Sequence, residues 1–405
     1  MIQITKKEDC CGCYTCASIC PRKCISMRED AEGFLYPYID KDLCVNCHLC
    51  EKVCPVILSR RSSESNEKEK ILLEEPPVYV AQCKDDQVRL ASSSGGVFTV
   101  LALQVLKRGG VVFGARWNED FSGVQHTWVD RPEELALFRG SKYLQSKIGA
   151  AFEEVQCFLK EGRPVLFTGT PCQVKGLKSF LRGKDEGLLA VAVACHSSPS
   201  PKVWRTFLSD LKERLGFTEL TAVGFRKKKI SNDDKGGFYM EGDAGSYCDD
   251  TYRLAYGAGF LKGLFSRPVC QDCPARGWSY GGDLIIGDFW GAERYWPDLN
   301  VDSGLSVVVC CTENGRKCFE EVKCEFSILN SAKWSWALIG NGGLNGGMKH
   351  HPLRAKFFDE FLAAANEKKA VKVMQKFVRL PFRRRLKGML RELKKWMKMC
   401  KRIRG

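Results

Sequence analysis

The sequence has no long apolar segment. Its longest uninterrupted apolar run, residues 188–195, contains eight residues, whereas a helix that crosses a membrane needs about 20. The N-terminal residues MIQITKKEDCCGC also lack the apolar stretch of a secretory signal. We therefore expect no transmembrane helix and a cytoplasmic location.

Histidine is scarce, with 5 residues among 405, but cysteine is abundant, with 22. Disulfide scaffolds are typical of short secreted chains, whereas this chain is long and shows no secretion signal. We therefore expect the regularly spaced cysteines to be reduced metal ligands. Because single cores seldom grow beyond about 250–300 residues, the length also indicates roughly two or three structural units.

Acidic residues are almost absent from the C-terminal segment, residues 366–405. This segment holds 16 Lys or Arg and 2 Asp or Glu, so it carries +14 of the total formal charge of +15. The rest of the chain is therefore nearly neutral. We expect no nucleic-acid binding by the body of the protein, because such binding depends on basic surfaces.

Two stretches near the N-terminus repeat one cysteine spacing, C-x2-C-x2-C-x3-C-P. This is the run of bacterial ferredoxins with two 4Fe-4S clusters, in which the fourth cysteine of each run binds the cluster of the other. The predicted ligands of one cluster are Cys10, Cys13, Cys16 and Cys54, and those of the second are Cys44, Cys47, Cys50 and Cys20. Zinc, which also takes four thiolates, is the minor alternative. Cys11, Cys24 and His48 fall outside the spacing and are interpreted as loop or packing residues.

Changes in composition divide the chain. Residues 1–58 form the predicted two-cluster domain, and residues 59–77 are polar and charged, which is typical of an exposed linker. In residues 78–365 apolar strand-like runs alternate with helical patterns, which predicts an α/β domain with some parallel strands. Beyond Gly224 short β-like runs predict an α+β elaboration. The predicted fold is thus a small ferredoxin-like domain, a larger α/β domain and a basic amphipathic C-terminal helix in residues 366–405.

A second group of cysteines lies in the large domain. Cys172 follows the strand-like run PVLFTG, Cys195 ends the run LLAVAVAC, and Cys270 and Cys273 form a C-x2-C pair. The first two lie where strands are predicted to end, which is the edge at which open α/β sheets gather ligands. These four thiols could bind a third 4Fe-4S cluster or zinc, although spacing alone does not bring them together.

Six segments within residues 78–312 form an ordered set: SSSGGVFTVLA, GSKYLQS, TGTPCQVKGLK, a Cys-His pair at a strand end, RPVCQDCP and GGDLIIGDFWG. In this order they resemble the coenzyme F-420 hydrogenase/dehydrogenase beta-subunit family. The resemblance implies a flavin-binding catalytic domain with its own 4Fe-4S cluster at Cys172, Cys195, Cys270 and Cys273. Family members act on the deazaflavin F-420, and related plant proteins reduce chlorophyll intermediates, so kinship does not fix the substrate.

Two Gly-containing runs are candidate cofactor contacts. Residues 92–96 precede a helical pattern, so hydroxyls, backbone N–H groups and the helix dipole could face a phosphate. With the resemblance, this run is the preferred cradle for the FAD diphosphate. Residues 287–291 end a strand and offer a close backbone approach and an aromatic wall to a planar ring system. The candidate residues are Ser93, Ser94, Gly95, Gly96, Gly287, Asp288, Trp290 and Gly291.

Further candidates come from the resemblance and from one histidine. The resemblance implies anion contacts at Lys142, Ser146, Arg226 and Lys228. Lys227 stands where the family pattern has an acidic residue, which weakens the assignment of its two neighbours. His196, beside Cys195, could supply a proton because an imidazole titrates near neutrality, and Lys142 is the second candidate catalytic residue. His126 has no ligand-like neighbour and is assigned no role.

The sequence therefore predicts an iron-sulfur flavoprotein oxidoreductase, in which electrons pass between ferredoxin-type clusters, a further cluster and FAD, to or from a small-molecule substrate or a redox partner protein. The alternative is a non-catalytic electron-transfer subunit that holds clusters but no flavin. After Pro381 apolar residues recur at helical spacing opposite a basic face, which is typical of a helix on an anionic membrane surface. A helix docked on the body and a basic arm for an acidic partner are the competing interpretations. We predict peripheral attachment to the inner membrane face.

Overall fold

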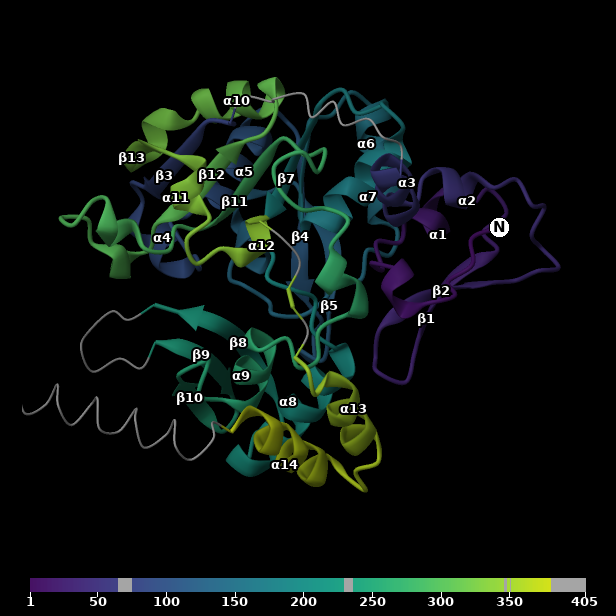
Figure 1. Cartoon of the computed structure of the whole chain (residues 1–405). Coiled ribbons are helices and arrows are strands. Elements are labelled where there is room, and N and C mark those ends of the chain that lie inside the picture. Colours follow the sequence, from purple (N-terminus) through teal and green to yellow (C-terminus); the bar gives the residue numbers. More distant parts are fainter. Residues whose placement is uncertain (65–74, 229–235, 346–347, 350, 380–405) are drawn as a thin grey trace, which may run out of the picture.

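The computed structural model describes residues 1–64, 75–228, 236–345, 348–349 and 351–379 (Figure 1). A small N-terminal module lies beside a larger body that is built on an eight-stranded sheet. No helix in the described ranges is long and apolar enough to cross a bilayer. The amphipathic helix predicted after Pro381 lies outside these ranges.

The N-terminal module combines a hairpin with short helices. Its elements are α1 (Thr15–Ile19), β1 (Ile25–Glu29), β2 (Leu35–Ile39), α2 (Leu49–Lys52) and α3 (Pro55–Glu64). The two cysteine runs fold alike, because α1 follows Tyr14 at φ 68° and α2 follows His48 at φ 59°. Few residues other than glycine adopt such angles. The repeat in the cysteine spacing is therefore also a repeat of the backbone.

The body is built around a mixed sheet with the strand order β13-β3-β12-β11-β7-β6-β4-β5. Its strands are β3 (Val78–Cys83), β4 (Val111–Trp117), β5 (Val124–Val129), β6 (Val165–Gly169), β7 (Leu188–Val193), β11 (Leu284–Asp288), β12 (Ser306–Cys310) and β13 (Phe326–Ala332). Neighbours among β4, β6, β7 and β11 pair in parallel, and the other pairs are antiparallel. Val165 and Phe167 join one buried core and Leu166 joins another, which explains why such strands read as continuous apolar runs.

Helices cover both faces of this sheet (Figure 1). α5 (Val97–Lys107) and α10 (Glu313–Glu320) pack on one face, and α6 (Ala151–Lys160) and α7 (Pro171–Leu181) pack on the other. Shorter helices in the connections are α4 (Asp86–Ala91), α11 (Trp334–Ala337) and α12 (Gly342–Asn345). The predicted α/β architecture is confirmed.

The expectation of an α+β elaboration beyond Gly224 needs a correction, because two of the short β-like runs on which it was based join the large sheet as β11 and β12. A separate α+β part is present, and it already begins at Pro201. It contains a three-stranded antiparallel sheet of β8 (Leu220–Lys227), β9 (Gly237–Gly242) and β10 (Gly245–Asp249). Its helices are α8 (Pro201–Leu215), α9 (Ala255–Leu261), α13 (Arg354–Leu362) and α14 (Glu367–Val378). α14 lies in the segment predicted as a basic tail, and it buries Ala370, Val371, Met374 and Phe377 in the core of the α+β part.

The N-terminal module is docked on the body through buried contacts. Phe34, at the hairpin, is 0% exposed and joins the aromatic core of the α+β part. Glu32 forms an ion pair with Arg354 of α13. α1 also packs against α7 of the body. These contacts fix the position of the predicted cluster ligands relative to the large sheet.

Candidate functional site

The predicted ligands of the N-terminal clusters gather in two places. The second group, Cys20, Cys44, Cys47 and Cys50, lines one small cavity together with Cys24. The sulfur of Cys24 lies 3.3 Å from that of Cys20. Because Cys20 belongs to the first run and the other three ligands to the second, this grouping agrees with the crossover of bacterial ferredoxins.

The first group, Cys10, Cys13, Cys16 and Cys54, is buried. Burial raises the pKa of Cys16, and the thiols of Cys13, Cys10 and Cys54, followed by Cys50 of the other group, raise it further. Cys13 and Cys10 likewise raise the pKa of Cys54. Such mutual effects require the groups to lie close together. The last cysteine of the second run thus lies with the first three cysteines of the first run.

The third group comes from three separate segments of the body. Cys172 lies in the first turn of α7 after β6, Cys195 follows β7, and Cys270 and Cys273 lie in and just after the 3-10 helix Pro268–Asp272. Burial raises the pKa of Cys195, and Cys270, Cys172 and Cys273 raise it further. The backbone N–H of Ser198 donates to the sulfur of Cys270 at 3.3 Å. The fold therefore brings together four thiols that the spacing alone could not.

Each group supplies four thiols, which is the donor set of 4Fe-4S clusters and of zinc. In the described part of the chain, no three metal-binding side chains converge on a point that one ion could occupy. A 4Fe-4S cluster does not require the four sulfur atoms to converge on one point, because each thiolate binds a different iron atom of the cluster. The donor sets fit 4Fe-4S clusters.

The first and third groups adjoin each other across the boundary between module and body. Cys11 lies between them, and the neighbouring thiols of Cys13 and Cys172 raise the pKa of its own thiol. α7 can approach the first ligand loop because Gly176 has no side chain. A Cβ there would lie 2.6 Å from Thr15 Oγ1 and 3.0 Å from the Cβ of Cys13. Cys11, outside the predicted ligand sets, is thus a contact between two of them.

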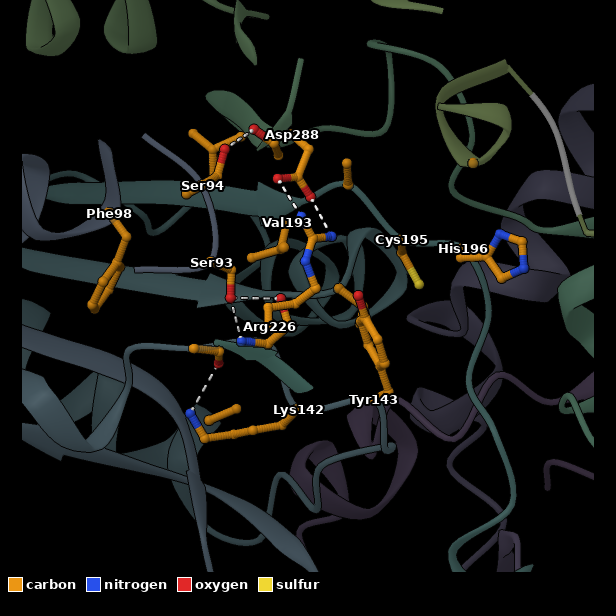
Figure 2. A pocket seen from close by; sticks show the side chains of 18 of the residues that line it. Ser93, Ser94, Phe98, Lys142, Tyr143, Val193, Cys195, His196, Arg226 and Asp288 are labelled. Carbon is orange, nitrogen blue, oxygen red and sulfur yellow. Dashed lines mark hydrogen bonds and ion pairs between the residues drawn. The ribbon is translucent and has the colours of Figure 1, made fainter. Parts of the chain in front are cut away.

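A cavity of about 420 Å³ lies at the carboxyl ends of β6, β7 and β11 and reaches Cys195 of the third group (Figure 2). This is the edge at which open α/β sheets gather ligands. Predicted residues that line it are Ser93, Ser94, Gly96, Lys142, Ser146, His196, Arg226, Gly287, Asp288 and Trp290. The predicted residues Gly95, Lys228 and Gly291 are not among its lining residues.

The Ser/Gly run is held from both sides. Ser141 donates from its N–H at 2.6 Å and from its hydroxyl at 2.9 Å to the hydroxyl oxygen of Ser93. The hydroxyl of Ser94 donates to the backbone carbonyl of Leu305 at 2.7 Å. Ser93 is therefore hydrogen-bonded to Ser141, on another segment that lines the cavity, whereas Ser94 is hydrogen-bonded to the residue that precedes β12.

The glycines of this run fit it onto the sheet. A Cβ on Gly95 would lie 2.2 Å from the carbonyl oxygen of Ala81, and one on Gly96 would lie 2.6 Å from the sulfur of Cys83. Gly96 also has φ +87° and directly precedes α5. The two glycines therefore allow the backbone of the Ser/Gly run to lie close to β3.

Lys142 lies partly buried beneath the turn that carries Ser141. Its ammonium donates to the carbonyls of Phe138 at 3.3 Å, Arg139 at 2.9 Å and Gly140 at 3.2 Å. Burial lowers the pKa of Lys142 to about 7. The side chain thus holds the turn in place, and its proton can leave near neutral pH.

Arg226 and Asp288, predicted separately, form a pair in the cavity wall (Figure 2). Both terminal nitrogens of Arg226 lie 3.1 Å from oxygens of Asp288, which is the bidentate geometry of strong ion pairs. The guanidinium also lies 4.9 Å from the ring centroid of Trp290. Lys228 donates to the carbonyls of Arg89, at 2.6 Å, and Ser94, so it supports the Ser/Gly run from behind.

Two histidines line the cavity, each with one buried ring nitrogen that has no hydrogen-bond partner within the described residues: Nε2 of His196 and Nδ1 of His126. Nε2 of His126 lies 2.9 Å from the carbonyl oxygen of Thr168. Burial lowers the pKa of His126 to about 4, so its ring is neutral. Buried polar atoms without a hydrogen-bond partner are rare in folded proteins and call for an explanation.

Sequence reasoning missed three parts of the cavity wall: His126, Tyr143 and residues 340–344. Tyr143 stacks on Phe260 with ring centroids 4.6 Å apart, and it lies inside the motif GSKYLQS. The segment GNGGL at 340–344 crosses the cavity near the third group, where a Cβ on Gly343 would lie 1.9 Å from the carbonyl oxygen of Cys195. The three glycines of this segment are the feature of the sequence that could have indicated a close approach of its backbone to the site.

Three parts of the chain match family models. Residues 9–57 match a 4Fe-4S dicluster domain. Residues 78–153 match the N-terminal model, and residues 162–329 the C-terminal model, of the coenzyme F-420 hydrogenase/dehydrogenase beta subunit. These two models together cover more than half of the chain.

Among solved structures, the chain is similar to one in a structure of the F-420-reducing NiFe hydrogenase complex from Methanosarcina barkeri. The identity is 17%, the match covers 76% of this chain and 93% of that chain, and the TM-score is 0.45. No curated protein matches the chain significantly.

Proposed function

The chain belongs to the coenzyme F-420 hydrogenase/dehydrogenase beta-subunit family, and we propose that it passes electrons between two ferredoxin-type 4Fe-4S clusters, a third cluster and FAD, to or from an organic substrate. The family consists of oxidoreductase subunits, and the N-terminal domain is a 4Fe-4S dicluster domain. The chain is therefore an iron-sulfur electron-transfer protein. The third cluster, FAD and a deazaflavin substrate such as F-420 are the proposed parts.

One observation carries this proposal: the three thiol groups form a series. The second group reaches the surface, where Cys47 is exposed. The first group is buried and adjoins the third group at Cys11 and Gly176. The third group opens on the cavity through Cys195. This order supports electron transfer between the surface of the N-terminal module and a ligand in the cavity.

The cavity has the size of a ligand site, and its walls and polar groups suit a flavin. Its volume lies within the range of about 300–1,000 Å³ typical of ligand sites. Tyr143 and Trp290 offer aromatic surface for a planar ring, and Ser93, Ser141 and Arg226 offer hydroxyls and a cation for a diphosphate. When bound, FAD links the one-electron chemistry of clusters to two-electron chemistry on an organic substrate.

His196 is the proposed proton carrier. It follows Cys195 directly, and its Nε2 is buried without a partner among the described residues. Its ring packs edge-on against Phe260 at 5.0 Å, which fixes its orientation in the wall. A proton-transfer group must lie within hydrogen-bond reach of the reacting atom, so the role proposed for His196 requires its ring to turn toward a ligand in the cavity that it lines.

The alternative is an electron-transfer subunit that holds the clusters but no flavin and delivers electrons to a separate enzyme. A beta subunit is by name one component of an assembly, so a redox partner protein fits both proposals. Anaerobic purification of the full chain with FAD supplied distinguishes them. We expect about twelve iron atoms, four for each cluster, and one FAD per chain. Full iron without retained FAD would favour the alternative.

Replacing Arg226 by methionine is expected to weaken FAD retention at least about tenfold, because the change leaves the Asp288 carboxylate uncompensated in the wall and removes the cation from Trp290. Fluorescence titration with FAD measures this effect. The matched control is Arg253→Met, since Arg253 is paired with Asp250 at 3.7 Å but is 82% exposed. Equal FAD affinity in both variants would contradict the proposed flavin site.

The C-terminal segment carries a further proposal, peripheral attachment to an anionic membrane. It rests on the sequence alone, in which basic and apolar residues alternate at helical spacing after Pro381. Each cation near such a surface contributes about 1 kcal/mol. We expect the full chain to sediment with anionic liposomes at low salt, and a chain that ends at Arg379 to remain in solution. Equal sedimentation of both chains would refute the attachment.

A further inference from the structure

Arg267 of the body reaches into the first ligand loop of the N-terminal module. Its side chain is 0% exposed. Its Nε donates to the carbonyl of Cys10 at 2.8 Å, Nη2 donates to the carbonyl of Leu35 at 2.7 Å, and Nη1 donates to Oε1 of Gln145 at 3.0 Å. Nη2 also donates to the sulfur of Cys10 at 3.5 Å. The guanidinium is thus almost fully hydrogen-bonded at a predicted cluster ligand.

No carboxylate forms an ion pair with Arg267 in the part of the chain that the structure describes. The partners named above are neutral carbonyl and amide oxygens, apart from the sulfur of Cys10. The ring of Tyr36 lies 4.4 Å and that of Phe34 5.5 Å from the guanidinium carbon, so aromatic surface shields the charge. A buried charge without a counter-charge is strongly unfavourable.

Arg354, like Arg267, joins the body to the N-terminal module. Arg354 donates to the carbonyl of Ser266, the residue before Arg267, at 2.9 Å, and it pairs with Glu32 of the module. One arginine of the interface therefore has a carboxylate partner, and the other faces a cysteine sulfur.

We propose that Arg267 is the counter-charge of the 4Fe-4S cluster that Cys10, Cys13, Cys16 and Cys54 hold, and that it raises the reduction potential of this cluster. A cluster with four thiolates is an anion, and its one-electron reduction adds one negative charge to it. A buried cation favours the more negative state, because Coulomb interactions are strong where water is excluded. Hydrogen bonds to a ligand sulfur act in the same direction.

This inference rests on the dicluster part of the proposed function and requires neither the third cluster nor FAD. The charge of Arg267 also acts to lower the pKa of Cys172 and, against the rise that burial causes, the pKa of Cys270, so a cluster in the third group would sense the same charge. The inference also gives Arg267 a role in docking, because the cation is compensated only when the cluster is present. Arg267 is then a positioning residue, which acts on electron transfer through the cluster beside it.

The test is a redox titration of the full chain, purified without oxygen and followed by electron paramagnetic resonance. In Arg267→Gln one midpoint potential of the module is expected to become more negative, while the potential of the cluster at Cys20, Cys44, Cys47 and Cys50 stays unchanged. Arg354→Gln, at the same interface, is the control and should leave every potential in place. An Arg267→Gln chain with full iron and unshifted potentials would overturn the proposal.

Gln145→Glu keeps the size of the side chain and sets a carboxylate against Arg267, although it gives up the hydrogen bond from Gln145 Nε2 to the carbonyl of Cys11 at 3.0 Å. It is therefore the second variant, which tests the proposal even if Arg267→Gln fails to fold. The same negative shift is expected, because the new charge neutralises the guanidinium. Unchanged potentials in this variant, with iron retained, would also overturn the proposal. A wild-type titration with two clusters instead of three would remove the third cluster from the proposed function, and the shift would still decide the role of Arg267.

Discussion

Replacing Cys172 by serine is expected to remove about one third of the bound iron, four atoms of about twelve. Cys172 lies with Cys195, Cys270 and Cys273, and it contributes to raising the pKa of each of these three thiols. Loss of one thiolate leaves three ligands for a cluster that takes four, whereas the two groups of the N-terminal module keep their full sets.

The measurement is iron and sulfide per chain after anaerobic purification, together with the resonance signals of the remaining clusters. Cys157→Ser is the matched control, because Cys157 lies exposed on α6 and belongs to no group. The same loss is expected for Cys273→Ser. Wild-type iron content in both the Cys172 and the Cys273 variants would refute the third cluster. Electron transfer from the N-terminal module to FAD should also fail in these variants.

The second large effect concerns the crossover in the N-terminal module. Replacing Cys20 and Cys24 together by alanine is expected to remove about one third of the iron, and the cluster lost is the one at Cys44, Cys47 and Cys50. Cys20 belongs to the first run in the sequence, but it lines the cavity of these three cysteines.

The double variant is needed because Cys24 lies 3.3 Å from Cys20 and can replace it as a ligand. Cys24→Ala alone is the control and should retain all iron, and Cys20→Ala alone should lose less iron than the double variant. Iron and sulfide assays with resonance spectra of the surviving cluster test this. Loss of the cluster at Cys10, Cys13 and Cys16 instead would show that no crossover exists.

The ferredoxin-type domain could be predicted from the sequence because its chemistry is local. A two-residue spacer turns the backbone around a cluster, and the structure repeats Tyr14 and His48 in left-handed conformation at matching positions. The large α/β sheet was also predictable, since buried parallel strands read as apolar runs. The third group was different, because Cys172, Cys195 and Cys270 lie on segments that only the order of strands in the sheet brings together.

Pairings in the cavity wall could not be predicted, because they depend on contacts between distant residues. Arg226 and Asp288 were chosen for separate reasons, and their ion pair joins β8 to the end of β11. His126 was set aside because no ligand-like residue stands near it in the sequence, but in the fold it lines the cavity and has one buried ring nitrogen that is unpaired among the described residues. Lys142 was predicted as an anion contact, and the structure gives its ammonium three carbonyl partners.

The glycine in the middle of α7 has a consequence for recognising relatives of this protein. Glycine inside a helix lowers helix stability by about 1 kcal/mol relative to alanine, so a free-standing α7 would be more stable with alanine at position 176. Here the missing side chain leaves room for Thr15 and Cys13 of the module. A relative without a docked ferredoxin module has no such constraint. The residue at this one position is therefore expected to distinguish chains whose module packs on α7 from chains that receive electrons in another way.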